Sequence, residues 1–158
     1  MLVVFTFFSI GTILAWRRFN TNEMNGLTGS LSFIGDRQRV LGLDYVRRSE
    51  YIEGSPFLQI FSYAQVLHGG TVNFSFAEHH SGIVSFARPD SVPRWTPGLE
   101  WHAERVDPRD IRQFDDAIVN ATDVQHHYLS TLPWFTPVTS EGRWRLYRCK
   151  KSGQAPPQ

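Results

Sequence analysis

The 158-residue sequence has little cysteine, no excess of charge of one sign and none of the common catalytic motifs. Its only cysteine, Cys149, excludes an internal disulfide and a Cys-x-x-Cys metal or redox site. The 16 basic and 15 acidic residues are interspersed and give a net charge of +1. Because nucleic-acid-binding proteins carry a basic patch or stripe, nucleic acid is not an expected partner. The length suits one globular domain with short additions.

The sequence also lacks the motifs that would identify a nucleophile, a phosphate-binding loop or a metal centre. It contains no Gly-x-Ser-x-Gly elbow, no Walker loop and no Gly-x-Gly-x-x-Gly after a strand. Two histidine pairs, at residues 79–80 and 126–127, are adjacent, so their side chains diverge on a strand or a helix. Ordinary polar surface residues account for the pattern Glu100-x-His102-x-Glu104. We therefore predict no catalytic set, no metal site and no cofactor.

The N-terminal stretch is the strongest compositional feature. Residues 2–16 are apolar except for two threonines, a serine and a glycine, and Arg17 and Arg18 follow directly after Trp16. As a helix this stretch would be about 22 Å long, whereas a full membrane span needs about 20 residues. An aromatic residue beside two arginines is typical of a helix end at the membrane interface, so residues 1–18 are predicted to be a partial, truncated or tilted membrane helix. A buried core helix and a signal sequence are the alternatives.

The segment at residues 39–45 is expected to be the central strand of the fold. Val40, Leu41 and Leu43 form a nearly continuous apolar run within it. Such a run suits a strand that is covered on both faces in a parallel sheet. Helical periodicity before this strand and a polar connection after it are typical of an α/β domain.

The remaining elements follow from periodicity, capping residues and turn residues. In chain order they are a helix at 20–34 with capping-box spacing at its start, a helix from 55–56 to 69–70, a strand at 71–77, an irregular segment at 78–101, a short helix at 107–113, a strand at 114–120, a helix from Thr122 or Asp123 to about 132, and a hairpin at 134–149. This order predicts an α/β fold: a small, mostly parallel sheet with helices on both faces and a C-terminal hairpin, preceded by the short apolar, membrane-type helix. The globular domain would cover residues 19–149, and residues 150–158 would be a disordered tail.

Four residues are candidate binding residues. Asp44 ends the central strand, at the edge where ligands collect in open α/β sheets, although a role in capping a nearby loop is the alternative. Trp95 and Trp101 belong to or border the irregular segment, which is either a lid or contact surface, or a packed loop. His102 stands next to Trp101.

Several stretches taken together resemble a known family. They are the apolar lead-in, the strand Arg39–Asp44, the helix that ends at Gly69-Gly70, the strand that starts at Phe114-Asp115, and the final strand with the run Arg143-Trp144-Arg145-Leu146-Tyr147-Arg148. They resemble the C-terminal soluble region of bacterial polytopic glycosyltransferases of the GT-C type, mannosyltransferase-like membrane proteins that use lipid-linked sugar donors. The resemblance covers about residues 10–150. In that family a bundle of membrane helices carries the catalysis, and a small α/β domain follows the last helix on the outer face.

The resemblance implies a non-catalytic extracytoplasmic domain that helps to bind substrate or to stabilise its membrane protein. None of the family's catalytic residues maps onto this sequence. The implied partner is membrane lipid or a lipid-linked sugar, with the domain on the periplasmic or extracellular face of the membrane. Arg17 and Arg18 depart from this orientation, because the positive-inside rule places them on the cytoplasmic side. The alternatives are a membrane-anchored interaction module without activity and a freestanding small enzyme with a site near Asp44.

Overall fold

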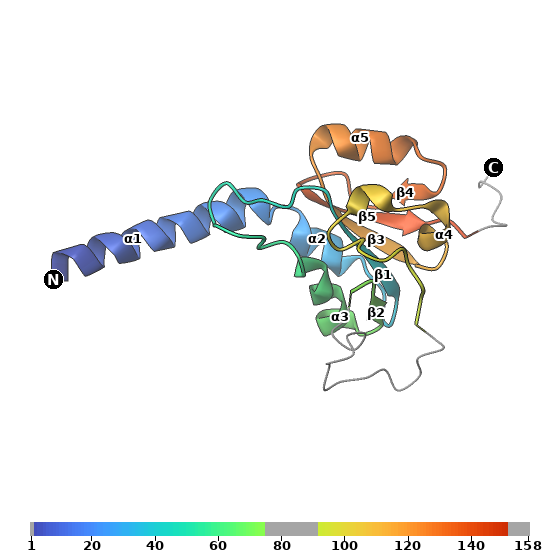
Figure 1. Cartoon of the computed structure of the whole chain (residues 1–158), viewed down its shortest axis with the longest axis horizontal. Helices are drawn as coiled ribbons and strands as arrows, with labels where there is room; N and C mark the ends of the chain where they lie inside the picture. Colours follow the sequence, from blue (N-terminus) through green and yellow to red (C-terminus); the bar gives the residue numbers. More distant parts are fainter. Residues whose placement is uncertain (1, 75–91, 152–158) are drawn as a thin grey trace.

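The strands form one five-stranded sheet in the order β2-β1-β3-β5-β4 (Figure 1). They lie within residues 2–74 and 92–151, which the computed structural model describes. Their bounds are β1 (Arg39–Asp44), β2 (Thr71–Val72), β3 (Asp116–Asn120), β4 (Phe135–Pro137) and β5 (Trp144–Cys149). β1 is parallel to β2 and to β3, whereas β5 is antiparallel to β3 and to β4.

The sheet is therefore mixed, and the prediction of a mostly parallel sheet is wrong. The physical reason is the C-terminal hairpin, which is present as predicted. A short turn between β4 and β5 forces these two strands to be antiparallel. Because β5 is the hairpin strand that inserts next to β3, it brings its reversed direction into the centre of the sheet.

Helical segments cover both faces of the sheet, as predicted. Alternation along the strands sends Val40 and Ile118 to one hydrophobic cluster and Leu41 and Val119 to the other. The first cluster includes residues of η1, α2 and α3, and the second includes residues of α4 and α5. The helical segments are α1 (Leu2–Arg18), the π-helical turn η1 (Phe19–Glu23), α2 (Leu27–Ser32), the 3₁₀ turn η2 (Ile60–Ser62), α3 (Tyr63–His68), the 3₁₀ turn η5 (Ala103–Arg105), α4 (Pro108–Ile111) and α5 (Asp123–Thr131).

The helix predicted at residues 20–34 is divided into two parts. α1 continues without a break into η1, so Asn20 lies inside a helical segment and does not cap one. α2 then starts after Gly26, which has a left-handed φ of 86°. A Cβ at Gly26 would meet the Trp144 carbonyl oxygen at 2.6 Å, so this turn packs directly on β5. Because the helical segment ends at Glu23 and the chain turns at Gly26, Glu23 lies against β5 of the sheet.

The helix predicted from residue 55 is shorter than expected. Residues 56–59 form turns, and the α-helix α3 starts only at Tyr63. Leu67 lies three residues after the buried Ala64, a spacing that would suit a buried helical stripe, yet it is exposed, and so is Val66. The strand after it is also short, because the Asn73 side chain takes over the pairing with β1. Its Oδ1 accepts from the Gly42 N–H (2.6 Å), and its Nδ2 donates to the Gly42 carbonyl (3.0 Å).

The caps predicted for the second half of the chain are present. Asp107 caps α4 and Thr122 caps α5, each in a capping box. Much of the irregular segment predicted at residues 78–101 and most of the predicted tail lie outside the described residues.

α1 projects from the domain as a long apolar helix (Figure 1). Its 17 residues correspond to a length of about 25 Å, compared with about 30 Å for the hydrocarbon core of a bilayer. Among the residues that the structure describes, no helix is both long enough and apolar enough to cross a membrane.

Gly42 is expected to tolerate no side chain. It lies in β1, and a Cβ there would overlap the fully buried ring of Phe61. Gly42→Ala should therefore lower the free energy of unfolding by about 1–3 kcal/mol, the usual cost of overpacking a core. Gly29→Ala is the matched control, because Gly29 lies within α2 and a Cβ there would meet nothing within 4 Å. The measurement is urea unfolding, in which the free energy of unfolding of this control should rise by up to about 1 kcal/mol from helix propensity. Equal effects of the two substitutions would contradict the close packing of Gly42 against Phe61.

Candidate functional site

The carboxyl ends of β1 and β3 border an open crevice of about 540 Å³. After β1 the chain continues to β2 on one side of the sheet, and after β3 it continues to β4 and β5 on the other side. The connections that leave the carboxyl ends of β1 and β3 therefore run in opposite directions. In open α/β sheets ligands bind where the strand order switches in this way. Four segments line the crevice: the end of η1 with the turn after it, the loop after β1, the start of α5, and the residues just before β5.

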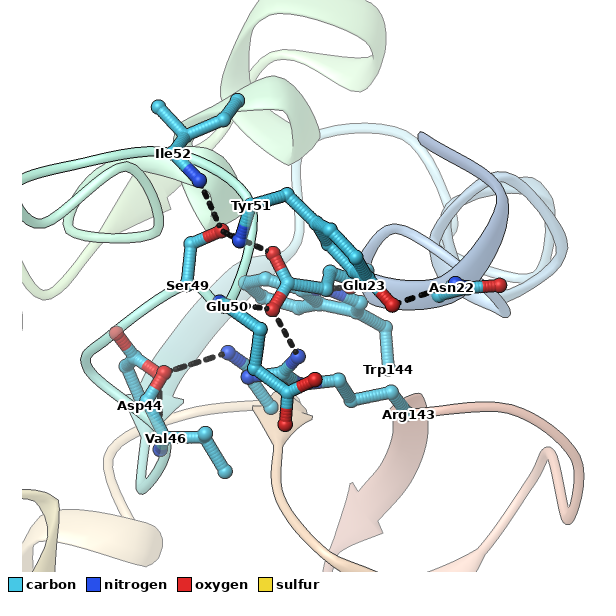
Figure 2. A network of polar contacts seen from close by, with 11 residues as sticks. Asn22, Glu23, Asp44, Val46, Ser49, Glu50, Tyr51, Ile52, Arg143 and Trp144 are labelled. Carbon is cyan, nitrogen blue, oxygen red and sulfur yellow. Dashed lines mark hydrogen bonds and ion pairs between the residues drawn. The ribbon is translucent and has the colours of Figure 1, made fainter. Parts of the chain in front are cut away.

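Glu23 is a buried carboxylate in the wall of this crevice (Figure 2). It accepts hydrogen bonds from the Ser49 hydroxyl and from the Glu50 N–H, the latter at 2.8 Å. Arg143 Nη1 forms an ion pair with Glu23 Oε1 at 3.2 Å. The backbone carbonyl of Glu23 accepts from the indole N–H of Trp144 at 2.9 Å. Burying a charge is costly unless it is paired and hydrogen-bonded, and Glu23 meets both conditions.

Asn120 connects Arg143 to a second buried carboxylate, Asp44. Arg143 Nε donates to Asn120 Oδ1 (2.9 Å), and Asn120 Nδ2 donates to Asp44 Oδ1 (2.8 Å). The Val46 N–H donates to the same Asp44 oxygen at 3.1 Å. Burial raises the pKa of Asp44 to about 6, because these hydrogen bonds and the neighbouring arginines offset only part of the lost hydration. The network therefore joins two carboxylates through one guanidinium and one amide.

Polar groups next to this network are already engaged in hydrogen bonds. A carboxyl group with a pKa of about 6 can exchange a proton near neutral pH, but catalysis also requires a partner group at the reacting atom. His126 is engaged elsewhere, with Nδ1 2.8 Å from the Tyr147 hydroxyl and Nε2 2.9 Å from the Arg143 carbonyl. The Ser49 hydroxyl bonds to Glu23 and to two backbone N–H groups. The described residues also contain no group of three potential metal ligands.

The structure does not gather into one site the four residues that the sequence singled out. Asp44 lies at the carboxyl edge, 4% exposed, and also accepts from the Val46 N–H as a loop-capping residue would. Trp95 packs against the ring of Phe114, with centroids 6.4 Å apart. Trp101 is exposed, and His102 Nδ1 lies 2.9 Å from a carboxylate oxygen of Glu104. None of the four lines the crevice, although Asp44 is linked through Asn120 to Arg143, which does.

The sequence did not identify Glu23, Asn120 or Arg143 as site residues. The spacing of Glu23 from Asn20 suggests a capping box, which conceals its role. Asn120 ends the strand beside Asp44, so a parallel pairing of these two strands would have found it. Arg143 reaches the site because β5 pairs antiparallel with β3. No local sequence pattern predicts which strand β5 pairs with.

Comparison with known proteins identifies no similar protein that would indicate the role of this site. No family model, no curated protein and no solved structure matches the chain.

Proposed function

We propose that this chain is a membrane-attached α/β domain with a binding role, the non-catalytic accessory domain of a GT-C-type glycosyltransferase-like membrane protein. The observation that carries the proposal is the surface of α1. Nine large apolar side chains on it are about half exposed or more, from Val3 to Trp16. An apolar surface of this extent marks an interaction site, and a helix that is apolar all round suits a lipid environment.

Two further features of α1 support lipid as its surroundings. The Thr12 hydroxyl donates to the Phe8 carbonyl one turn earlier at 2.9 Å, so this polar group has a partner within the helix. Trp16, Arg17 and Arg18 form its last turn, where an amphipathic ring and two cations suit the headgroup region of a bilayer. The polar domain begins directly after them.

The carboxyl-edge crevice supplies the binding role. Its buried polar groups bond to one another, as in a preformed recognition site. By the GT-C resemblance, the ligand would be the polar part of a membrane lipid or a lipid-linked sugar, on the periplasmic or extracellular side. The domain would then add affinity or stability to a membrane protein whose catalysis lies in other segments.

The membrane attachment is tested with the full chain and one pair of substitutions. Phe5 and Phe8 lie on α1 and are exposed, so Phe5→Glu with Phe8→Glu changes the helix surface without disturbing the core. We expect the unmodified chain to float with lipid vesicles and the double variant to remain in solution, because charged side chains are costly in lipid. Tyr128→Glu, at an exposed position on α5, is the control and should float normally.

The link to a larger membrane protein is tested in the source cells. An antibody against residues 39–147 should detect a membrane-bound band several times larger than the 18.2 kDa of this chain. A membrane-bound band of about 18 kDa would reject the glycosyltransferase link and retain the anchored module. A soluble band would reject both.

A second candidate function is proton transfer at Asp44. The pKa of about 6 favours it, because a general acid or base works best when its pKa lies near the working pH. This function requires a substrate whose reacting atom reaches the buried Asp44 carboxyl, which lies behind the lining residues of the crevice.

A further inference from the structure

The outer face of α3 is apolar, the reverse of an ordinary surface helix. Tyr63, Val66 and Leu67 are spaced three and four residues apart, so they share one side of the helix. All three are exposed, with Val66 at 76%, whereas Ala64 on the other side is fully buried. We call this surface the α3 face. A surface helix normally directs its apolar stripe into the core, so an outward stripe predicts a partner.

A groove connects the α3 face to α1. Its volume is about 680 Å³, and its lining includes Ile13, Trp16 and Arg17 of α1 together with Pro56, Ile60 and Tyr63. We call it the junction groove. Tyr63 belongs both to this groove and to the α3 face, so one apolar surface runs from α1 across the junction onto the globular domain.

We infer that the junction groove and the α3 face form a second membrane-docking surface, which seats the globular domain itself on the bilayer. The inference rests on the proposed attachment through α1. Continuity of the apolar surface with α1 identifies the occupant as lipid, with acyl chains against Ile13, Trp16 and Ile60. Arg17 lies in the same groove, where its guanidinium meets the phosphate of a headgroup. The globular domain would then contact the membrane surface directly, in addition to its attachment through α1.

The test places an environment-sensitive NBD fluorophore on the α3 face of the full chain. Val66→Cys supplies the attachment point, and Val124→Cys on α5 is the matched control, because Val124 is a helical valine with 81% exposure. α5 packs on the opposite side of the sheet from α3. The native Cys149 need not be replaced, because burial raises the pKa of its thiol and limits its access to reagents.

Vesicles of phosphatidylcholine and phosphatidylglycerol in equal parts serve as the membrane. We expect both labelled proteins to float equally, while the emission shifts to the blue and increases several-fold only for the label at residue 66. Equal flotation with an unchanged spectrum at residue 66 would reject the docking surface and retain attachment through α1. Absence of flotation for both proteins would reject the attachment and with it the docking surface. A blue shift without vesicles that grows with protein concentration would identify a second copy of the chain as the occupant and also reject the inference.

Introducing negative charge on the α3 face gives an independent measurement. Val66→Asp with Leu67→Asp should weaken partitioning to these vesicles about tenfold, whereas Val124→Asp should leave it unchanged. Because all three positions are exposed, none of these substitutions disturbs the core. Equal partitioning of the two variants would contradict lipid contact at the α3 face.

Discussion

Replacement of Trp144 by alanine is expected to lower the free energy of unfolding by about 3–5 kcal/mol, the usual cost of removing a large aromatic side chain from a core. Trp144 has no exposed surface and lies in β5. Its ring packs edge-on against Phe57 at a centroid distance of 6.2 Å. Its N–H donates to the Glu23 carbonyl, which ties the end of η1 to the sheet. Since small domains have total stabilities of about 5–15 kcal/mol, this loss would remove a large part of the total.

Denaturant unfolding followed by far-ultraviolet circular dichroism measures this effect. Trp101→Ala is the matched control, because Trp101 is 47% exposed, and its expected cost is below about 1 kcal/mol. Trp144→Phe keeps an aromatic ring but removes the donor, so it should lose about 1–3 kcal/mol and remain folded if the alanine variant does not. Equal costs for Trp144→Ala and Trp101→Ala would show that β5 and η1 do not depend on this side chain.

The sequence predicted those elements that depend on local patterns. The apolar run of β1 and the caps at Asp107 and Thr122 are local signals, and all of them correspond to the structure. The position of Asp44 at the carboxyl edge follows from the same reasoning, because a strand ends where its apolar run ends.

The errors arise where tertiary contacts override local preference. The capping-box spacing at Asn20 does not start a helix, because α1 already propagates through it and adding a residue to an existing helix is easier than nucleating a new one. The side chain of Asn73 replaces a stretch of backbone pairing, which no β-propensity describes. Leu67 has the spacing of a core residue but faces outward, and only the position of α3 against the sheet decides this.

The candidate site was predictable only in part, because its members come from distant segments. Glu23 and Arg143 are separated by 120 positions in the sequence, and they meet because the Gly26 turn packs on β5. A left-handed glycine marks a turn but does not say which strand the turn will meet. Asn120 was within reach of sequence reasoning, since it ends the strand that neighbours Asp44.

Replacement of Asp44 by asparagine is expected to stabilise the protein at neutral pH. Burial raises the pKa of Asp44 to about 6, whereas an aspartate in the unfolded chain titrates near 3.9. Between these values the folded state binds more protons than the unfolded state, so stability falls as the pH rises through this window. The accumulated cost above about pH 6 is about 3 kcal/mol, since one unit of pKa corresponds to about 1.4 kcal/mol. An asparagine oxygen can still accept from Asn120 and from the Val46 N–H, so the variant avoids the cost of the buried charge.

The measurement is the difference in unfolding free energy between Asp44→Asn and the unmodified protein at about pH 4 and about pH 8. The difference should move toward stabilisation by up to about 3 kcal/mol between these two conditions. Asp115→Asn is the control with the opposite sign. Burial acts to raise the pKa of Asp115, but hydrogen bonds from Arg39 and Lys151 more than compensate and hold it below the ordinary value. That variant should therefore lose more stability at about pH 8 than at acidic pH.

Whether Asp44→Asn raises or lowers the free energy of unfolding at neutral pH is also evidence about function. A buried carboxylate that destabilises its own fold at neutral pH is retained for a reason other than stability, and perturbed groups of this kind concentrate at functional sites. A stabilised Asp44→Asn variant would therefore support the carboxyl-edge crevice as the site where this domain meets its ligand. A variant that is destabilised equally at both pH values would mean that the Asp44 charge does not limit stability, and the crevice would lose its main electrostatic support.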